Sequence, residues 1–313
     1  MAKILIGACS WADKPLIDSG AFYPSKKMSA EGRLRFYASN FPIVEVDSSY
    51  YALPSVANAE RWAERTPDDF VFDIKAFRLF TNHWTEAKVF PRDLEHELPP
   101  LEGKKRGYYY EDVPRDIVDS LWMRFESALI PLAGAGKLGQ VLFQFPDFFF
   151  PSSKSLDHIL EAKERLRGFR LAIEFRSPTW TDEKHLQDTL KFFKDNELTF
   201  VCVDTPHGLP SSMPPIAEVT TDVAYVRFHG HNTETWNKKG ITARERFDWY
   251  YTEDELEEWV PKVKSLAEDA GQVHLLVNTN DQDQGPRNAR LLAKILQGEL
   301  PGIEKQEVLV GAA

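Results

Sequence analysis

Residues 140–175 read QVLFQFPDFFFPSSKSLDHILEAKERLRGFRLAIEF. The stretch opens and closes with short, mostly apolar runs, residues 140–145 and 170–175, each bounded by polar or turn residues. Between them, residues 156–166 alternate apolar and charged side chains with the period of an amphipathic helix. A short strand, a helix and another short strand form the repeating unit of a parallel α/β sheet.

The same alternation extends over nearly the whole chain. Most residues in the predicted strands are apolar, as expected when both faces of a parallel sheet are covered. The predicted strands are residues 3–9, 43–47, 70–75, 140–145, 170–175, 199–204, 223–229 and 273–278. Eight strands alternating with helices predict an α/β fold, a single (β/α)8 TIM barrel over residues 1–298, followed by a C-terminal tail at residues 299–313.

Composition and charge exclude several classes of protein. The 313 residues are 42% hydrophobic and 27% charged, which argues against disorder and coiled-coil rods. The formal charge of −10 argues against non-specific coating of nucleic acid or anionic membrane, because such binding needs an excess of Lys and Arg. No apolar run reaches the roughly 18–20 residues of a membrane span, and none near the amino end suits a secretory signal, so we expect a cytoplasmic protein.

Known motifs are missing from the sequence. The two cysteines match no CxxC spacing, so we expect neither a disulfide framework nor a cysteine zinc site. The sequence contains no GxxxxGK[ST], GxGxxG, HExxH or GxSxG pattern. The sequence therefore gives no motif support for four enzyme classes: P-loop nucleotidases, Rossmann dehydrogenases, zincins and α/β-hydrolases.

Two connections are longer than a turn requires: residues 76–114 after the third strand and residues 231–251 after the seventh. In a (β/α)8 barrel, such connections lie at the carboxyl-end mouth, where barrel enzymes keep their active sites. We expect residues 82–110 and 231–251 to cover the mouth, with Trp84 or Trp236 near its rim. His83 is expected only to pack its own loop.

Polar residues two positions apart end the otherwise apolar strands. Side chains alternate between the faces of a strand, so Glu45 and Asp47 share one face. The same spacing pairs Asp73 with Lys75, Glu174 with Arg176, Cys202 with Asp204, Arg227 with His229, and Asn278 with Asn280. We expect these groups to face the barrel axis at the mouth and to pair with one another, because an unpaired buried charge costs several kcal/mol. Any one of these residues could instead belong to an ion-pair network that only stabilises the fold and takes no part in function.

Several ordered segments carry a resemblance to a known family. They are VEVDSSYY (44–51), LGQVLFQFP (138–146), AIEFRSPTW (172–180), YVRFHG (225–230) and PRNA (286–289). In these segments the chain resembles the YecE-like proteins, domain of unknown function family seventy-two. The resemblance covers nearly the whole chain and implies a TIM barrel with no settled activity. Family members usually have Asn where this chain has Asp47, so the chain carries an added carboxylate beside Glu45.

The leading hypothesis is an enzyme acting on a small polar anionic substrate, phosphorylated or carboxylated, without a cofactor. Cations can clamp the anion, carboxylates and histidine can transfer protons near neutral pH, and aromatic rings can wall the mouth. The catalytic candidates are Glu45, Glu174, His229 and Asp204. The substrate-binding candidates are Lys75, Arg176, Arg227, Asn278, Asn280, Tyr50, Gln144 and Trp180.

Two other hypotheses stay open. One is a metal-dependent phosphoesterase or nuclease-like enzyme, because Mg²⁺ and Mn²⁺ favour oxygen ligands. Its predicted metal ligands are Glu45, Asp47, Glu174, Asp204 and His229. The interleaved cations weaken this hypothesis, since they can neutralise the same carboxylates. The other is a non-catalytic module that binds a small ligand. The sequence leaves the reaction (lyase, isomerase or hydrolase), the substrate and the oligomeric state open.

Overall fold

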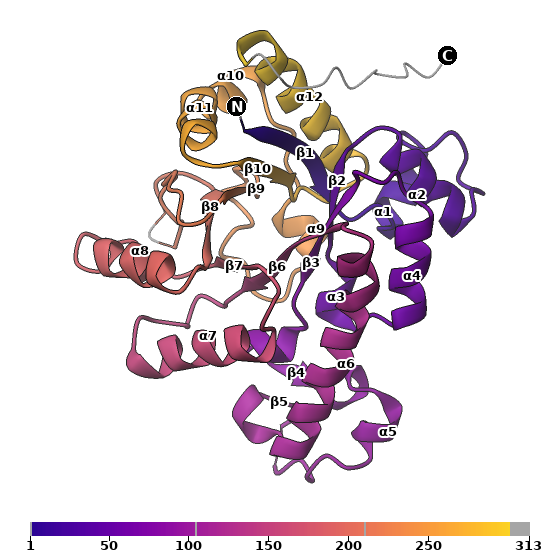
Figure 1. The fold of residues 1–313 in the computed structure, drawn as a ribbon, viewed down its shortest axis with the longest axis vertical. Coiled ribbons are helices and arrows are strands. Elements are labelled where there is room, and N and C mark those ends of the chain that lie inside the picture. Colours follow the sequence, from indigo (N-terminus) through magenta and orange to yellow (C-terminus); the bar gives the residue numbers. More distant parts are fainter. Residues whose placement is uncertain (1, 104, 210, 301–313) are drawn as a thin grey trace.

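A closed barrel of eight parallel strands forms the centre of the computed structural model, which describes residues 2–103, 105–209 and 211–300 (Figure 1). The barrel strands are β1 (Lys3–Cys9), β2 (Ile43–Val46), β3 (Val71–Lys75), β6 (Leu138–Gln144), β7 (Leu171–Glu174), β8 (Thr199–Asp204), β9 (Val223–Phe228) and β10 (Gln272–Val277). Their order around the barrel is β1-β10-β9-β8-β7-β6-β3-β2, so each strand pairs with the next barrel strand along the chain and β10 closes on β1. The predicted (β/α)8 TIM barrel is confirmed.

Helices surround the barrel and connect most of its strands, whereas the described residues between β8 and β9 contain no helix (Figure 1). The α-helices are α1 (Lys14–Ser19), α2 (Ala30–Ala38), α3 (Ser48–Tyr51), α4 (Val56–Glu64), α5 (Arg92–Glu95), α6 (Arg115–Gly134), α7 (Ser153–Arg165), α8 (Leu186–Asp195), α9 (Ala243–Arg246), α10 (Glu253–Glu257), α11 (Val260–Asp269) and α12 (Gln284–Glu299). The 3₁₀ turns are η1 (Arg78–Thr81), η2 (Ala87–Val89), η3 (Tyr110–Asp112) and η4 (Pro178–Trp180). Local chemistry sets several ends: Thr252 and Glu255 form a capping box at α10, and Pro261 lies in the first turn of α11.

The interior of the barrel is polar along part of its length. The register between β1, β2 and β3 places Cys9, Glu45 and Asp73 on the same inner face. Asp73 lies below the mouth, where its carboxylate accepts from the backbone N–H of Gln140 at 2.6 Å and lies 2.9 Å from Nδ1 of His274. A Cβ at Gly139 would lie 2.3 Å from Asp73 Oδ1, so only glycine lets β6 approach this carboxylate so closely.

The connection after β3 forms a small lobe beside α6. Figure 1 shows β4 (Thr85–Glu86), β5 (Gly107–Tyr108) and α5 there, away from the barrel strands. Asp93 pairs with Arg124 of α6, and Trp122 Nε1 donates to the Tyr110 hydroxyl at 2.9 Å. The prediction that residues 82–110 cover the mouth is therefore wrong for the parts around Asp93 and Tyr110, which lie against α6.

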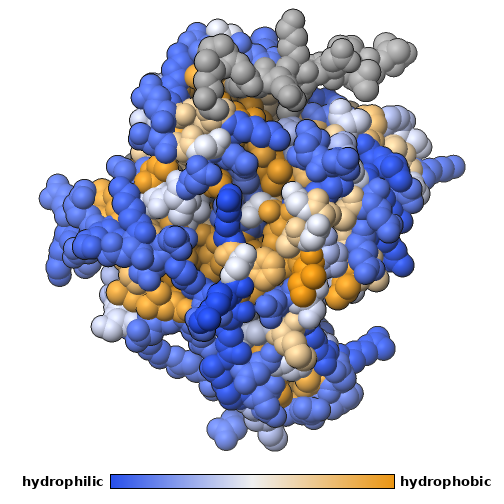
Figure 2. Space-filling view, viewed as in Figure 1, coloured by the Kyte–Doolittle hydropathy of each residue, from blue (hydrophilic) through white to orange (hydrophobic). Residues whose placement is uncertain are grey.

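Helix α12 runs to Glu299, one residue past the predicted domain end at 298. The rest of the predicted tail, residues 301–313, lies outside the described residues. Within the described part of the chain, no helix combines the length and apolarity that crossing a bilayer requires. The face shown in Figure 2 is largely hydrophilic at its edge, with hydrophobic side chains gathered toward its middle.

Candidate functional site at the barrel mouth

Arg227 of β9 lies at the centre of the site, and its side chain is fully buried. Its Nε and Nη2 donate to the two carboxylate oxygens of Glu45 at 2.8 and 2.5 Å, and its Nη1 donates to Glu174. Tyr225 donates to the same Glu45 carboxylate at 2.7 Å. Two-point pairing of this kind is the strong form of an arginine–carboxylate interaction. Arg227 thus ties β2 to β7 across the barrel, and each of its guanidinium nitrogens already has an acceptor.

Glu174, the last residue of β7, accepts hydrogen bonds from three side chains, one at the end of β6 and two at the end of β9. Its Oε1 lies 2.7 Å from Gln144 Nε2 and 2.9 Å from His229 Nε2, while Arg227 binds Oε2. Burial acts to raise the pKa of Glu174, but Arg227 and His229 outweigh it and hold that pKa well below its usual range. The Glu174 carboxylate is therefore ionised and anchors the groups around it.

His229 is held on both sides of its ring. Its Nδ1 lies 2.9 Å from Asn278 Nδ2, opposite the contact with Glu174. Burial lowers the pKa of His229 to about 3, so the ring is neutral at pH 7. The hydrogen-bond network assigns the proton to Nε2, which donates to Glu174, and leaves Nδ1 as the acceptor for Asn278.

The guanidinium of Arg176 has one hydrogen-bond donor that is not used in the protein described. Its Nε lies 3.5 Å from Glu174, whereas its Nη1 is buried and has no hydrogen-bond partner among the residues that the structure describes. Its guanidinium lies 5.0 Å from the ring centroid of Trp236 and 5.5 Å from that of Phe247. Both rings belong to the connection after β9, and Phe247 also lies 5.4 Å from the His229 ring. Trp236 therefore lies beside the mouth, as predicted, and Phe247 of the same segment packs against its charged groups.

A second cationic group lies at the edge formed by β3. Lys75 Nζ is 3.0 Å from Asp47 Oδ1 and 5.0 Å from the ring centroid of Tyr50. Arg78 approaches the same Tyr50 ring at 5.2 Å, and the His83 ring lies 5.3 Å from it. Burial, with Lys75 and Arg78 adding to it, lowers the pKa of His83 to about 3. The sequence did not point to Arg78, and His83 was expected only to pack its own loop; both lie in the connection after β3, at η1 and two residues beyond it.

Asp204 does not face the barrel axis, contrary to prediction. The register pairs Asp204 with Phe228 and Val203 with Arg227, so Val203 faces inward and Asp204 faces the surrounding helices. There its Oδ1 accepts from Trp259 Nε1 at 2.9 Å. The prediction from side-chain alternation failed on β8 because apolar residues occupy both faces of this strand. The pattern of polar and apolar residues then does not show which face points into the barrel.

Trp180 does not wall the mouth. Its side chain is buried, its ring stacks on Phe175 at 4.0 Å, and its Nε1 donates to the backbone oxygen of Phe149 at 2.6 Å. The residue therefore packs the layer between strands and helices. Asn278 and Asn280 follow β10, and the buried Oδ1 of each has no hydrogen-bond partner within residues 2–103, 105–209 and 211–300.

The predicted magnesium or manganese ligands do not form one cluster. Arg227 binds both glutamates, Lys75 pairs with Asp47, and Asp204 points outward. Among the described residues, three metal-ligating side chains come together in the groups Cys9–Glu45–Asp47 and Asp204–His207–His231. The first group lies against Lys75 and Arg227, whose charges oppose a bound cation. The five-residue metal set is therefore wrong.

A family model described as "Protein of unknown function DUF72" matches residues 5–309. The chain belongs to the DUF72 family. The UPF0759 protein YunF of Bacillus subtilis (strain 168) is 29% identical over 309 residues, which cover 97% of this chain and 99% of that protein. A solved DUF72 structure from Enterococcus faecalis V583 has a TM-score of 0.75 at 22% identity, covering 94% of this chain and 95% of that one. Another from Thermotoga maritima MSB8 has a TM-score of 0.73 at 26% identity, covering 94% and 99%.

Membership of DUF72 confirms the resemblance found in the ordered sequence segments, and the solved DUF72 structures share the barrel fold. The names of these relatives state no reaction or substrate. What this DUF72 protein does must therefore be argued from the residues at its mouth.

Proposed function

We propose that this DUF72 protein binds a small phosphorylated or carboxylated molecule at the barrel mouth and acts on it by proton transfer. The observation that supports this most directly is the buried Nη1 of Arg176, for which the described part of the chain offers no hydrogen-bond partner. A buried donor left without an acceptor costs about 1–3 kcal/mol. An anionic oxygen at this position would remove that cost and gain a charge-assisted hydrogen bond.

The surroundings favour an anion at Arg176 rather than at the other two predicted cations. Arg227 is enclosed by Glu45 and Glu174, and Lys75 is paired with Asp47. Arg176 has only the longer 3.5 Å contact with Glu174, and 16% of its side chain is exposed. It is therefore the cation with capacity left for a ligand, with Lys75 and Tyr50 as a second, weaker contact. The free Oδ1 atoms of Asn278 and Asn280 suit hydroxyl groups of the same ligand.

The two buried glutamates suit different roles. Burial raises the pKa of Glu45 to about 7, while the pKa of Glu174 is held low by Arg227 and His229 against the effect of burial. Two carboxyls with pKa values pushed apart are a common basis for acid–base chemistry. We assign proton exchange to Glu45, with its pKa near the working pH. Glu174 is then a positioning residue that holds Arg176, Arg227 and His229.

A second candidate is a non-catalytic ligand-binding module. It is favoured by the fact that both oxygens of Glu45 and both of Glu174 already accept hydrogen bonds. The two ring nitrogens of His229 are also both engaged. A general base needs a lone pair within reach of the substrate, so catalysis requires this network to rearrange when ligand binds.

A thermal-shift screen of phosphorylated and carboxylated metabolites tests the binding proposal. A metabolite that stabilises the wild type should bind roughly tenfold or more weakly to the Arg176→Met variant, because one charge-assisted hydrogen bond is lost. Arg167→Met is the matched control, since Arg167 is exposed and pairs only with Glu164 on the surface. Unchanged affinity in Arg176→Met would refute the anion site.

Incubation of that metabolite with the protein then separates the two candidate functions. Nuclear magnetic resonance of the mixture detects any new product. Turnover that is lost in Glu45→Gln supports the enzyme. Tight binding without chemical change supports the binding module.

A further inference from the structure

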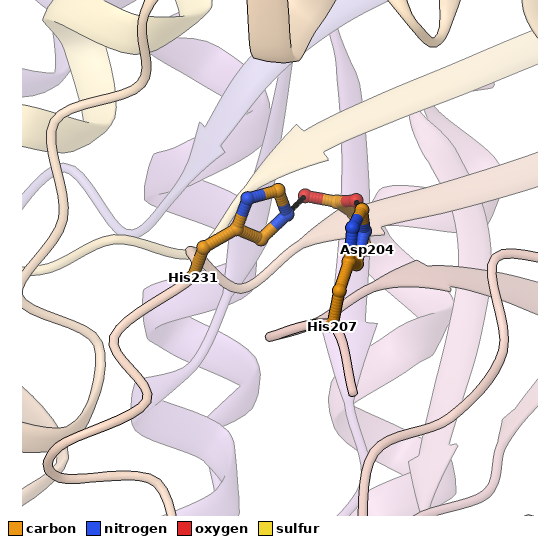
Figure 3. A group of neighbouring side chains, drawn as sticks. All are labelled: Asp204, His207 and His231. Atoms are coloured by element: carbon orange, nitrogen blue, oxygen red, sulfur yellow. Dashed lines mark ion pairs between the residues drawn. The ribbon is translucent and has the colours of Figure 1, made fainter. Parts of the chain in front are cut away.

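A cluster of two histidines and an aspartate lies on the outer side of β8, separate from the mouth site. Figure 3 shows the carboxylate of Asp204 beside the imidazole rings of His207 and His231. His231 Nε2 is 2.8 Å from Asp204 Oδ2, and His207 Nε2 is 4.0 Å from Asp204 Oδ1. The two rings are 4.6 Å apart. One potential ligand atom from each residue lies within 4.8 Å of the others.

The backbone at Gly230 creates this arrangement. His229 and His231 would share one face of a continuous strand, but Gly230 has φ of +81°, which reverses the chain between them. His229 therefore points into the barrel and His231 points out toward Asp204. A Cβ at Gly230 would lie 2.5 Å from the Cβ of Trp249, so no other residue fits there without displacement.

The groups behind the cluster hold two of its side chains in place. Glu255 Oε1 lies 2.9 Å from His231 Nδ1 and also accepts from Trp249 Nε1 at 3.2 Å. On Asp204, Oδ1 accepts from Trp259 and Oδ2 from Tyr251. A carboxylate on the far nitrogen of a metal-binding histidine is the usual outer support of such a site, since it fixes the ring and its tautomer.

We propose that Asp204, His207 and His231 bind a divalent transition metal ion, with Zn²⁺ as the best match. Two imidazoles and one carboxylate are the ligand set of many open zinc sites, in which water or substrate takes the fourth position. Imidazole ligands also disfavour Mg²⁺ and Ca²⁺, which prefer oxygen alone. Solvent reaches the cluster, because 52% of the His207 side chain and 13% of the His231 side chain are exposed.

The distances need only a small adjustment. Ligand bonds of about 2.0–2.2 Å place the donor atoms of a tetrahedral zinc site roughly 3.4 Å apart. His231 Nε2 lies 2.8 Å from Asp204 Oδ2 and His207 Nε2 lies 4.0 Å from Asp204 Oδ1, so the contacts to the two carboxylate oxygens lie on either side of this value. His207 has the freedom to close the longer distance, since its side chain is exposed. Each Asp204 oxygen has a second lone pair besides the one used by Trp259 or Tyr251.

The experiment uses the full chain without a polyhistidine tag, stripped of metal by a chelator and titrated with ZnCl₂ by calorimetry. The wild type should bind one Zn²⁺ per chain. His207→Ala should weaken this binding at least roughly tenfold, and Glu255→Gln should weaken it about 10–100-fold through the orientation of His231. CoCl₂ in place of ZnCl₂ should give the strong visible absorption of a four-coordinate ion in the wild type and lose it in His207→Ala.

The control variant is His185→Ala, which removes an exposed histidine that lies 2.8 Å from Asp182 in another histidine–aspartate pair. It should leave zinc binding unchanged. Loss of folding does not confuse the result, because the exposed His207 side chain contributes little to the core. The proposal is overturned if the wild type binds no zinc at one ion per chain, if His207→Ala binds zinc as tightly, or if His185→Ala weakens binding equally. None of these outcomes bears on the anion site at Arg176.

Discussion

Replacing Arg227 with methionine should destabilise the barrel because it leaves two buried carboxylates without their cation. Glu45 and Glu174 are both fully buried, and Arg227 contacts both. Methionine keeps much of the side-chain length and apolar contact but supplies no charge. The variant therefore isolates the electrostatic role of Arg227 from its role in packing.

The expected loss follows from the cost of breaking a buried ion pair by removing one partner, about 3–5 kcal/mol. At roughly 2–4 °C per kcal/mol for a large domain, Tm should fall by about 6–20 °C. Urea unfolding followed by tryptophan fluorescence gives the free energy, and calorimetry gives Tm. The surface variant Arg124→Met, which breaks only the exposed pair with Asp93, should change Tm little.

A triple variant tests the cause of that loss. Glu45→Gln and Glu174→Gln added to Arg227→Met remove all three charges while keeping the shapes of the side chains. Uncharged replacement of a whole buried ion-pair group is often neutral, so this variant should recover more than half of the lost stability. If the triple variant is as unstable as Arg227→Met, or if Arg227→Met itself loses less than about 1 kcal/mol, unpaired charge is not what destabilises the barrel.

Three further outcomes are expected. The pKa of His83 is about 3 when folded and roughly 6.5 when unfolded, so the unfolded state binds more protons and stability falls as pH falls. The free energy of unfolding in urea should therefore drop for the wild type relative to His83→Gln, by roughly 2 kcal/mol between about pH 7.5 and pH 5. Cys9 and Cys202 are buried, and burial raises both thiol pKa values, so a thiol reagent should detect neither in the native protein and both after denaturation. Gly230→Ala should lower the free energy of unfolding by about 1–3 kcal/mol, measured in urea, because alanine is strained at φ of +81°.

The fold was predictable because it depends on features that repeat along the sequence. Each predicted strand matches an observed one with its ends within two residues, since apolar runs bounded by polar residues mark the buried strands of a parallel barrel. The connection after β3 shows the limit of this reasoning. Its position in the chain placed it at the mouth, but the pairing of Trp122 with Tyr110 draws it onto α6 instead.

The site was predictable only where a strand shows which of its faces is inside. In β2 the valines and carboxylates alternate, and Glu45 does face the barrel axis, as expected. In β8 the residues of both faces are apolar until Asp204, so the alternation carried no information and the assignment failed. The prediction that Trp180 walls the mouth was also wrong, because this aromatic ring packs on Phe175 between strands and helices although it follows β7 closely in the chain.

The sequence could not predict which charged side chains pair across the barrel. This pairing decides which of them can still bind a ligand. Lys75, Arg176 and Arg227 look equivalent in the sequence, since each follows a carboxylate by two residues or precedes a histidine by two. Only the closed barrel brings Glu45 and Glu174, from opposite parts of the chain, onto Arg227 and leaves Arg176 with a free donor. Likewise, His207 and His231 become neighbours only because Gly230 turns the chain outward after β9. In this barrel, strand spacing determines which residues reach the mouth, whereas contacts between distant strands determine which of them remain free to bind.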